Sequence, residues 1–394
     1  MSWQIYLSLS AMMYFDYAVR GSWGPVLSAH LLGPMKMSGK QAGWIYSMYP
    51  LACVVSPLIG GQIVDRWIAT EWFLGAANLV GGVALLAASR ANTFPSMLAL
   101  VGLHCLFFAP TLGLVNSLAF THMTDPKLEY FRVRVWSSVA WVSVGWLLSA
   151  WRYYGKTPFR GSDALLLGSL FSFVMAVYAP LCLPHTPPPG SSHWAASWPP
   201  LVAMLSSWKV LVFLVLSLIV SSQLQFYFIG TSKFLEDIGF PRAHVPAIMT
   251  VAQMATVGAM VFVLPYLFPR IGYQGTLSLG AFFWLALYLI YVLQPPRWLI
   301  VAAQALHGLA YAFFFDAAFI YVNQIAPAEI RGTAQSLYTV ITLGLGLFLG
   351  THFAGIVLDR CRHEGRIHWR PFFATPCLTL VVCIAAFLLF FAEQ

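Results

Sequence analysis

Two acidic residues lie inside long apolar stretches of the chain. The segment HGLAYAFFFDAAFIYV (307–322) contains Asp316 among aromatic and aliphatic residues, and YFDYAVRGSW (14–23) contains Asp16. A carboxylate at the centre of a bilayer costs roughly 2.5–3.5 kcal/mol on insertion scales, so such a residue marks a path for protons or substrate. Both acids are therefore candidates for proton coupling. For Asp316, the structural alternative is a hydrogen bond to a neighbouring helix or to a serine hydroxyl.

Asp16 has a possible partner one helical turn away. Arg20 follows it at i+4, a spacing that permits an ion pair on one helix face. Such a pair would indicate a structural or gating role for both residues. The other interpretation is that Asp16 binds a proton and releases Arg20 when it does so.

The apolar segments around Asp16 and Asp316 are expected to cross a membrane. Of 394 residues, 59% are hydrophobic and 9% charged, against about 25% charged in soluble domains. Apolar blocks of about 20 residues cross a bilayer as helices, which hydrogen-bond their own backbone. We therefore predict an all-α membrane protein with twelve spans, at 5–31, 41–63, 71–89, 95–120, 134–152, 163–183, 210–232, 244–267, 274–293, 298–322, 332–357 and 371–391.

A proline-rich segment divides these spans into two groups of six. LPHTPPPGSSHWAASWPP (183–200) holds enough prolines to interrupt a helix. A weak repeat links the two groups, since RVRVWSSVAW opens span five and EIRGTAQSLY opens span eleven. We predict two six-helix bundles in pseudo-twofold arrangement, at 1–183 and 210–394, joined by a cytoplasmic linker at 184–209. A binding site is expected between such repeats.

Composition and motifs exclude several other classes. The net charge of +8 comes from Lys and Arg scattered among short loops, which does not indicate nucleic-acid binding. The six cysteines lie mostly in apolar blocks without metal-ligand spacing, so we expect no metal and no cofactor. No P-loop, zinc-hydrolase or nucleophile-elbow motif is present, so an enzyme is not expected. Met1 leads almost directly into the first apolar block, and we predict no removable signal peptide.

Two signals disagree about orientation. With the spans above, even-numbered loops carry seven Lys and Arg and odd-numbered loops carry thirteen, which favours cytoplasmic odd loops. The segment GGQIVDRWIATEW (60–72) instead resembles the cytoplasmic signature between spans two and three of the major facilitator superfamily. We follow the motif, which places both termini in the cytoplasm. Asp65 and Arg66 of this motif, with Arg20 and Arg331, are assigned gating or structural roles.

Several longer segments resemble the nucleoside:proton symporter family of that superfamily. They are RGSWGPVLSAHL (20–31), APTLGLVNSLAF (109–120), FRVRVWSSVAW (131–141), SSQLQFYFIGTSKFL (221–235) and HGLAYAFFFDAAFIYVNQIAPAEIRGTAQSLY (307–338). The resemblance implies a fold of the major facilitator type and import of nucleosides driven by the proton gradient, by alternating access to one central cavity. It further implies a monomer in the bacterial inner membrane, with nucleoside, protons and lipid as its partners.

The resemblance also implies substrate-binding positions on span five. Arg134, Ser138 and Trp141 share one helix face, at i, i+4 and i+7. In the family a similar face holds the sugar and the base, with threonine at the position of Ser138 and phenylalanine at that of Trp141. The alternative for Arg134 is an interfacial arginine that binds lipid phosphate.

Spans seven and eight contribute two amides. Gln225 and Gln253 match family binding positions, and an amide both donates to and accepts from ribose hydroxyls and base edges. The alternative for each is a contact between helices. Phe228 stands where the family pattern has asparagine. Thr256 stands where the pattern resembles glutamate, so a protonatable group is absent there.

Span ten offers His307 and Tyr311 one turn apart, both able to stack on a base. A structural histidine is the alternative for His307. The resemblance implies an aspartate directly after Tyr311, where this chain has Ala312, while Asp316 follows one turn later. These exchanges leave open a proton-independent facilitator, or a carrier of a nucleobase, modified nucleoside or sugar. A transport-inactive membrane sensor is the interpretation least favoured.

Overall fold

The computed structural model describes residues 1–155, 162–188, 198–327 and 331–391. The regular elements of this part of the chain are helices and one short hairpin, which confirms the prediction of an all-helical protein. Eight helical stretches in the described part are long and apolar enough to cross a membrane. They are Thr70–Ala88, Phe94–His122, Asp163–Cys182, Trp208–Asp237, Val245–Leu293, Arg297–Ile325, Ala334–Arg360 and Trp369–Phe390. The 49-residue stretch Val245–Leu293 greatly exceeds the length of one crossing.

The chain divides into two compact units. Unit 1 comprises residues 1–192 and 231–250, and unit 2 comprises residues 193–230 and 251–394. The predicted boundary at 184–209 thus lies near the first division, but the segment 231–250 groups with the N-terminal helices instead of the C-terminal ones.

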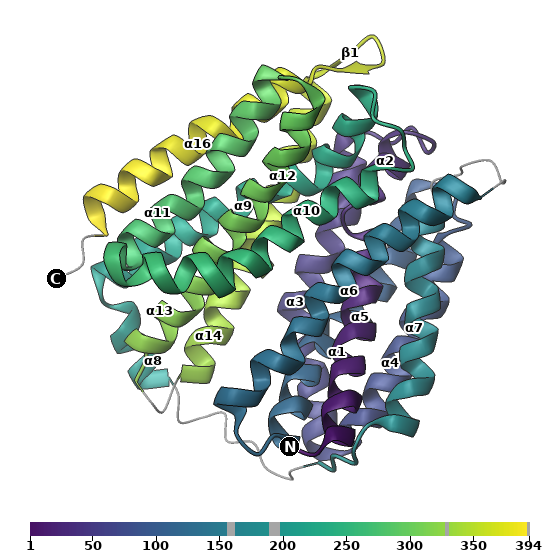
Figure 1. Ribbon diagram of the computed structural model, residues 1–394, viewed down its shortest axis with the longest axis vertical. Helices are drawn as coiled ribbons and strands as arrows, with labels where there is room; N and C mark the ends of the chain where they lie inside the picture. The colour runs from purple at the N-terminus through teal and green to yellow at the C-terminus, as the bar shows by residue number, and fades with distance from the viewer. Residues whose placement is uncertain (156–161, 189–197, 328–330, 392–394) are drawn as a thin grey trace. The chain divides into compact units, whose positions relative to one another are not determined.

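Unit 1 is built from seven helices and the segment 231–250. The helices are α1 (Trp3–Trp23), α2 (Leu27–Leu32), α3 (Gly39–Arg66), α4 (Thr70–Ala88), α5 (Phe94–His122), α6 (Pro126–Tyr154) and α7 (Asp163–Cys182). Helix α1 packs against α6 and α7, α4 packs against α5 and α7, and α3 packs against α5 (Figure 1). Helix α1 therefore packs against α6, the helix that carries the candidates Arg134, Ser138 and Trp141.

The predicted span at 5–31 is not one continuous helix, because α1 ends at Trp23 and α2 begins at Leu27. Pro25 lacks a backbone N–H and so cannot donate the next hydrogen bond of the helix. The break is hydrogen-bonded through Tyr46, whose hydroxyl donates to Gly24 O at 3.0 Å and accepts from Ser28 N at 3.0 Å. The backbone groups freed at the break thus have partners in α3.

Unit 2 contains α8 (Trp198–Leu205), most of α9 (Trp208–Asp237), the C-terminal part of α10 (Val245–Gly258), and the rest of the chain. Helix α11 (Leu264–Leu293) is broken at Gly272, which has φ 59° and ψ −168°. An L-residue with a side chain avoids that geometry. The break falls between the predicted spans 244–267 and 274–293. It explains how one 49-residue stretch accommodates two of them.

Three π-helical segments interrupt the C-terminal helices. They are η2 (Ala259–Val263) after α10, η3 (Ala312–Asp316) between α12 (Arg297–Tyr311) and α13 (Ala317–Ile325), and η5 (Val340–Gly346) between α14 (Arg331–Thr339) and α15 (Leu347–Arg360). Segments η2 and η3 meet in a cluster of Ala259, Leu264, Ala312 and Phe313. Such segments frequently occur at functional sites, because they shift the helical register.

The predicted linker contains a helix that was not expected. Helix α8 begins at Trp198, so Pro199 and Pro200 lie in its first turn. Proline is tolerated there because the first N–H groups of a helix have no intrahelical partner. The remainder of the linker between 189 and 197 lies outside the described residues.

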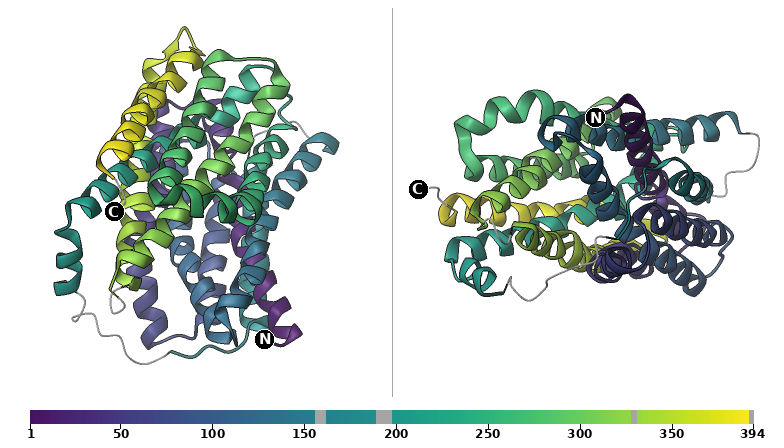
Figure 2. Two further views of the ribbon diagram at one scale, coloured as in Figure 1. Left: turned by 60° about the vertical axis from the view of Figure 1, so that its left-hand side comes forward. Right: turned by 90° about the horizontal axis from the view of Figure 1, so that it is seen from below.

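A two-stranded hairpin joins α15 to α16 (Trp369–Phe390). Strands β1 (Arg362–His363) and β2 (Arg366–Ile367) pair antiparallel. The two turn residues, Glu364 and Gly365, both have positive φ, of 49° and 76°, as a type I′ turn requires. The hairpin projects beyond the ends of its two helices (Figure 2).

Candidate functional site

Asp16 lies in the interior of unit 1. Its side chain is 0% exposed, and neither carboxylate oxygen has a hydrogen bond. The polar groups that act on it are the Thr111 side chain of α5 and the Arg134 guanidinium of α6. The Thr111 hydroxyl itself donates to Phe108 O at 2.7 Å. Asp16 is therefore a buried acid that faces one cation and one hydroxyl across helix boundaries.

Arg134 is held by neighbours on both sides of the interface between α1 and α6. Its guanidinium carbon lies 4.4 Å from the ring centroid of Tyr17, a cation–π contact. It also donates to the Ser137 hydroxyl on its own helix. The side chain is partly exposed. Arg134 thus sits next to Asp16 and retains accessible surface, as a substrate-binding residue requires.

The ion pair that the spacing of Asp16 and Arg20 permits does not form. Arg20 points the other way along α1, and its guanidinium carbon lies 4.2 Å from the Trp23 ring centroid and 4.4 Å from that of Tyr49. Gly24 permits this position, because a side chain there would overlap Arg20 Nη1. The i+4 spacing made the pair possible, but two aromatic rings hold Arg20 instead.

Ser138 and Trp141 continue the Arg134 face of α6. Both are partly buried. Trp141 lies against Gly21 of α1, where a Cβ would be 3.4 Å from the Trp141 ring. The three predicted residues of span five thus follow one helix that packs on α1, and Arg134 lies beside Asp16.

Three further residues around Arg134 were missed in the sequence. The Tyr130 hydroxyl donates to Asn116 Oδ1 at 2.8 Å, and Asn116 Nδ2 donates to Leu112 O at 2.7 Å. Tyr130 lies one turn before Arg134 on α6, and Tyr17 directly follows Asp16 on α1. The segments that carry the family resemblance contain Asn116, so the signal was present, but its geometry was not.

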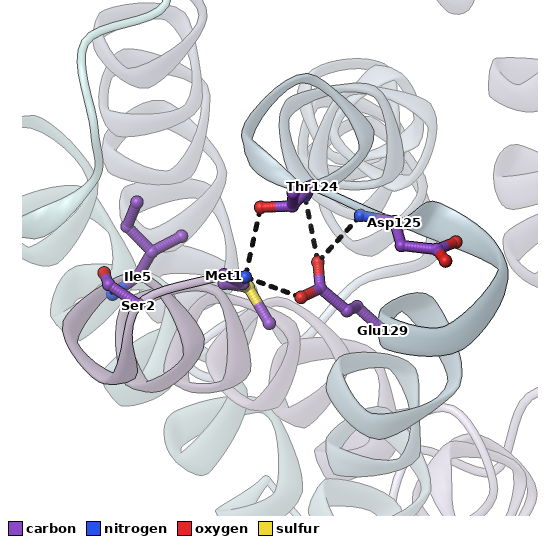
Figure 3. Close-up of polar contacts among 6 residues, drawn as sticks. All are labelled: Met1, Ser2, Ile5, Thr124, Asp125 and Glu129. Carbon is purple, nitrogen blue, oxygen red and sulfur yellow. Dashed lines mark hydrogen bonds and ion pairs between the residues drawn. The ribbon is translucent and has the colours of Figure 1, made fainter.

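The start of α6 is fixed by an ionic cluster. The amino group of Met1 lies 2.6 Å from Glu129 Oε1 and 3.1 Å from the Thr124 hydroxyl (Figure 3). Glu129 Oε2 accepts from the backbone N–H of Thr124 at 2.9 Å and of Asp125 at 3.3 Å. The hydrogen bond from the Met1 ammonium lowers the pKa of the Glu129 carboxyl. The cluster ties α1 to the helix that carries Arg134.

His307 lies in an aromatic cluster of unit 2. Its ring stacks on Tyr227 with centroids 3.7 Å apart and planes 17° apart. Trp284 Nε1 donates to His307 Nδ1 at 3.2 Å. An indole nitrogen only donates, so Nδ1 is the acceptor and Nε2 carries the proton of the neutral ring. Phe228 meets the same ring edge-on at 6.2 Å. His307 therefore has the packing and hydrogen-bond partners expected of a structural histidine, the alternative stated above.

A second layer of polar contacts supports this cluster. The Tyr227 hydroxyl donates to Gln304 Oε1 at 3.0 Å, and Gln304 Nε2 donates to the Tyr291 hydroxyl at 2.6 Å. The Tyr288 hydroxyl donates to Gln223 O at 2.8 Å. All of these groups are buried. They fix the positions of α9, α11 and α12 around His307.

The two predicted amides differ in their surroundings. Gln225 is 4% exposed, and its Oε1 has no hydrogen bond. Gln253 is only partly buried, and the residue is not without an interaction partner. A buried carbonyl oxygen without a donor is costly, so Gln225 is the amide with unused capacity to accept a hydrogen bond from a ligand.

Thr256 serves the contact between α10 and α12. Its hydroxyl lies 3.1 Å from Ala252 O and 3.2 Å from Gly308 O, and the residue is 7% exposed. Gly308 is required there, because a Cβ would overlap Ala252 O and lie 2.7 Å from Thr256 N. The Thr256 hydroxyl thus connects two helices at their closest approach.

Asp316 ends the π-helical segment η3. Both Asp316 and Tyr311 are partly exposed, whereas Ala312 between them is 0% exposed in the cluster with Ala259. The one-turn relation expected between Ala312 and Asp316 assumed α-helical geometry, which is wrong for this segment. The charge of Asp316 acts on the buried hydroxyl of Tyr338 in α14. Tyr311 packs on Phe315, with centroids 4.9 Å apart.

The loop motif between the second and third predicted spans is largely helical. Helix α3 continues through Arg66, which is exposed, and α4 begins four residues later at Thr70. An arginine in the last turn complements the helix dipole. The side chains of Asp65 and Arg331 lie outside the described part. Among the described residues, no group of three or more His, Cys, Asp or Glu could hold a metal ion.

Comparisons with known proteins agree with this arrangement. The model of the family described as "Nucleoside H+ symporter" matches residues 3–394. The chain is similar to the nucleoside permease NupG of Escherichia coli K12, at 22% identity over 92% of this chain and 90% of NupG. It is also similar to the xanthosine permease of the same organism, at 24% identity over 93% of this chain and 91% of that permease.

The crystal structure of NupG shares the fold. It superposes with a TM-score of 0.88 at 21% identity and covers 99% of this chain and 100% of that one. The fold is therefore that of NupG. The family match points to a transporter of the major facilitator type, and the long apolar helices make it a multi-pass membrane protein. On the match across almost its whole length, the chain belongs to the nucleoside H⁺ symporter family.

Proposed function

We propose that this protein imports nucleosides by proton symport across the bacterial inner membrane. The observation that carries the proposal is the family match from residue 3 to residue 394. The names of two relatives, a nucleoside permease and a xanthosine permease, support nucleosides as the substrate class. The twelve predicted spans would form two six-helix bundles, at 1–183 and 210–394, that alternately open one central cavity to each side.

The candidate residues divide the recognition task by chemistry. In unit 1, Arg134 and Ser138 would hydrogen-bond the sugar or a base carbonyl, and Trp141 would stack on the base. In unit 2, Gln225 and Gln253 would supply amide groups. The Nε2–H of His307 would donate, because Trp284 occupies Nδ1. Tyr311 and Phe228 would complete the aromatic lining, while Thr256 would act through the helix contact with Gly308.

Two carboxylates are the candidates for coupling. Asp316 lies at the end of η3 and keeps accessible surface, so it could exchange a proton with water in the cavity. Asp16 is fully buried beside Arg134. In the proposed cycle a carboxylate takes a proton from the periplasm and the substrate then binds. The bundles rock, and the proton leaves into the cytoplasm.

Uptake of radiolabelled uridine and adenosine tests this function. Cells that lack their own nucleoside carriers would express the chain, with and without a protonophore. We expect concentrative uptake that collapses with the protonophore, and Asp316→Asn should lose accumulation while it keeps exchange. Uptake that only equilibrates and ignores the protonophore would identify a facilitator. The absence of uptake would overturn the nucleoside assignment.

Both termini are proposed to be cytoplasmic. The β1–β2 hairpin, which precedes the last predicted span, would then lie on the periplasmic side of the inner membrane. Cys361 is a poor reporter of this, because it is 8% exposed and burial raises the pKa of its thiol. Glu364 at the hairpin turn is exposed. Glu364→Cys in a background without other cysteines should react with an impermeant maleimide in intact cells. Labelling only after the membrane is opened would reverse the orientation.

A further inference from the structure

We propose that Asp16 is a proton-binding site within unit 1, and that its protonation frees Arg134 to bind substrate. The substrate half of this inference rests on the proposed function, while the proton-binding half stands on the geometry of unit 1 alone. Asp16 and Arg134 would together link proton binding to substrate affinity.

The surroundings of Asp16 fit a neutral carboxylic acid. The side chain is completely buried, and neither oxygen accepts a hydrogen bond. An ionised carboxylate in such a place would need hydrogen-bond donors or a directly bound cation to offset the loss of water. Arg20, four residues along the same helix, does not supply one, because it lies on Trp23 and Tyr49. Complete burial of Asp16 therefore favours the protonated carboxyl in this conformation.

Within the described ranges, the cation that acts on Asp16 is Arg134. On α1 itself the neighbouring ionisable residue is Tyr17, and on α5 the polar neighbours are Thr111 and Asn116. On α6 the charged neighbour is Arg134, and Tyr130 interacts in turn with Arg134 and Tyr17. The ionisable residues of α7 lie near its two ends. At the start, Asp163 pairs with Arg152 at 2.6 Å. Toward the end, the Tyr178 hydroxyl donates to Ser8 O at 3.1 Å, and Cys182 is exposed. Arg134 is the group whose charge would meet an ionised Asp16.

In this proposal Arg134 contacts Tyr17 and Ser137 when Asp16 is neutral, and Asp16 itself when it is ionised. With Asp16 neutral, the guanidinium rests on the Tyr17 ring and on the Ser137 hydroxyl, and it keeps exposed surface for a ligand. When Asp16 gives its proton to water, the new carboxylate attracts the guanidinium, since an ion pair in a dry interior is strongly favoured over two separate charges. Arg134 then turns from the ligand to Asp16, and substrate affinity falls.

A direct titration of Asp16 tests the proton site without any substrate. Infrared difference spectra of the purified protein, recorded across pH, would show the carbonyl stretch of a protonated carboxyl that is absent in Asp16→Asn. We expect Arg134→Gln to move the titration midpoint of this band upward by at least one pH unit, because it removes the opposing positive charge. Arg134→Lys keeps the charge and should leave the midpoint nearly unchanged. Arg20→Gln should also leave it unchanged.

The opposite pattern would overturn the inference. A midpoint that moves with Arg20→Gln but not with Arg134→Gln would make Arg20 the partner. A band that never titrates, or that persists in Asp16→Asn, would remove Asp16 as a proton site. These outcomes do not depend on nucleosides, so they remain informative if uptake experiments reject the proposed substrate.

Equilibrium binding of uridine at several pH values tests the link to Arg134. Wild-type affinity should fall about tenfold as pH rises through the Asp16 midpoint, whereas Asp16→Asn should keep the low-pH affinity throughout. Thr111→Val should retain the fall, because it leaves both charges in place. An Asp16→Asn protein whose affinity still falls with the wild-type midpoint would contradict the coupling. Failure of wild type to bind uridine would instead reject the proposed function.

Discussion

The indole nitrogen of Trp284 lies 3.2 Å from Nδ1 of His307 and determines which imidazole nitrogen is free. The ring is held a second time by its stack on Tyr227. His307 thus presents one fixed donor, Nε2–H, in place of two interchangeable nitrogens. In this protein the orientation of a candidate substrate residue is set by a helix, α11, for which no binding residue was predicted.

Trp284→Phe should weaken nucleoside binding through His307. The substitution keeps the aromatic packing and removes the donor, which leaves Nδ1 unpaired and the tautomer unfixed. A lost hydrogen bond of this kind costs about 1 kcal/mol, so the uridine dissociation constant should rise about five- to tenfold in a binding titration. Trp298 is 71% exposed, so Trp298→Phe is the matched control. Equal effects of both substitutions would contradict this role for Trp284.

Gly308→Ala should destabilise unit 2. The new methyl group would overlap Ala252 O and press on Thr256 N, and such overpacking typically costs about 1–3 kcal/mol. The measurement is thermal unfolding in detergent, where the melting temperature should fall by several degrees. Gly258 provides the control, because a Cβ there meets nothing within 4 Å. If Gly258→Ala lowered the melting temperature as much, close packing at Gly308 would not be the cause.

Thr256→Val should affect stability more than substrate binding. The hydroxyl bonds to Ala252 O and Gly308 O, so its loss leaves the interface with one bond fewer, at a cost of about 1 kcal/mol. Melting should occur at a lower temperature while the Michaelis constant for uridine changes less than twofold. Thr256→Ser keeps the hydroxyl and should behave like wild type. A large change in the Michaelis constant at unchanged stability would return Thr256 to the substrate site.

The cluster at Glu129 predicts a pH-dependent contribution to stability. The Met1 ammonium lowers the pKa of this carboxyl, so the folded state holds its proton less tightly than the unfolded state does. The resulting stabilisation is present above the unfolded pKa of about 4.3 and is lost as pH falls through the lower folded value. Glu129→Gln should therefore melt slightly below wild type at pH 7. The two proteins should converge in acid, and a difference that grew with acidification would have the wrong sign.

The presence of helices could be predicted from the sequence, because apolar segments in lipid must hydrogen-bond their own backbone groups. Local backbone geometry did not follow. The break at Pro25 and the helix at Trp198 depend on where a proline falls relative to a helix start. The π-helical segment that ends at Asp316 packs on η2 in one cluster. Neither effect has a periodic signature in the sequence.

Positions along one helix could be predicted from the sequence, whereas contacts between helices could not. The spacing on α6 placed Arg134, Ser138 and Trp141 along one helix, and the acid at position 16 was identified by its apolar setting. The i+4 spacing permitted a pair with Arg20 that does not form, because spacing ignores competing contacts such as the one that holds Arg20 on Trp23. Partners from other helices, such as Thr111 for Asp16, depend on tertiary packing.

Proton movement on substrate addition tests the proposed symport most directly. The purified protein would be reconstituted into vesicles that contain a pH-sensitive dye, without an imposed gradient and with valinomycin and potassium to remove charge build-up. Uridine added outside should acidify the lumen as protons enter with the nucleoside, and an Asp316→Asn Asp16→Asn double variant should not acidify it. Entry of labelled uridine into wild-type vesicles without any change in luminal pH would contradict proton symport and identify a facilitator.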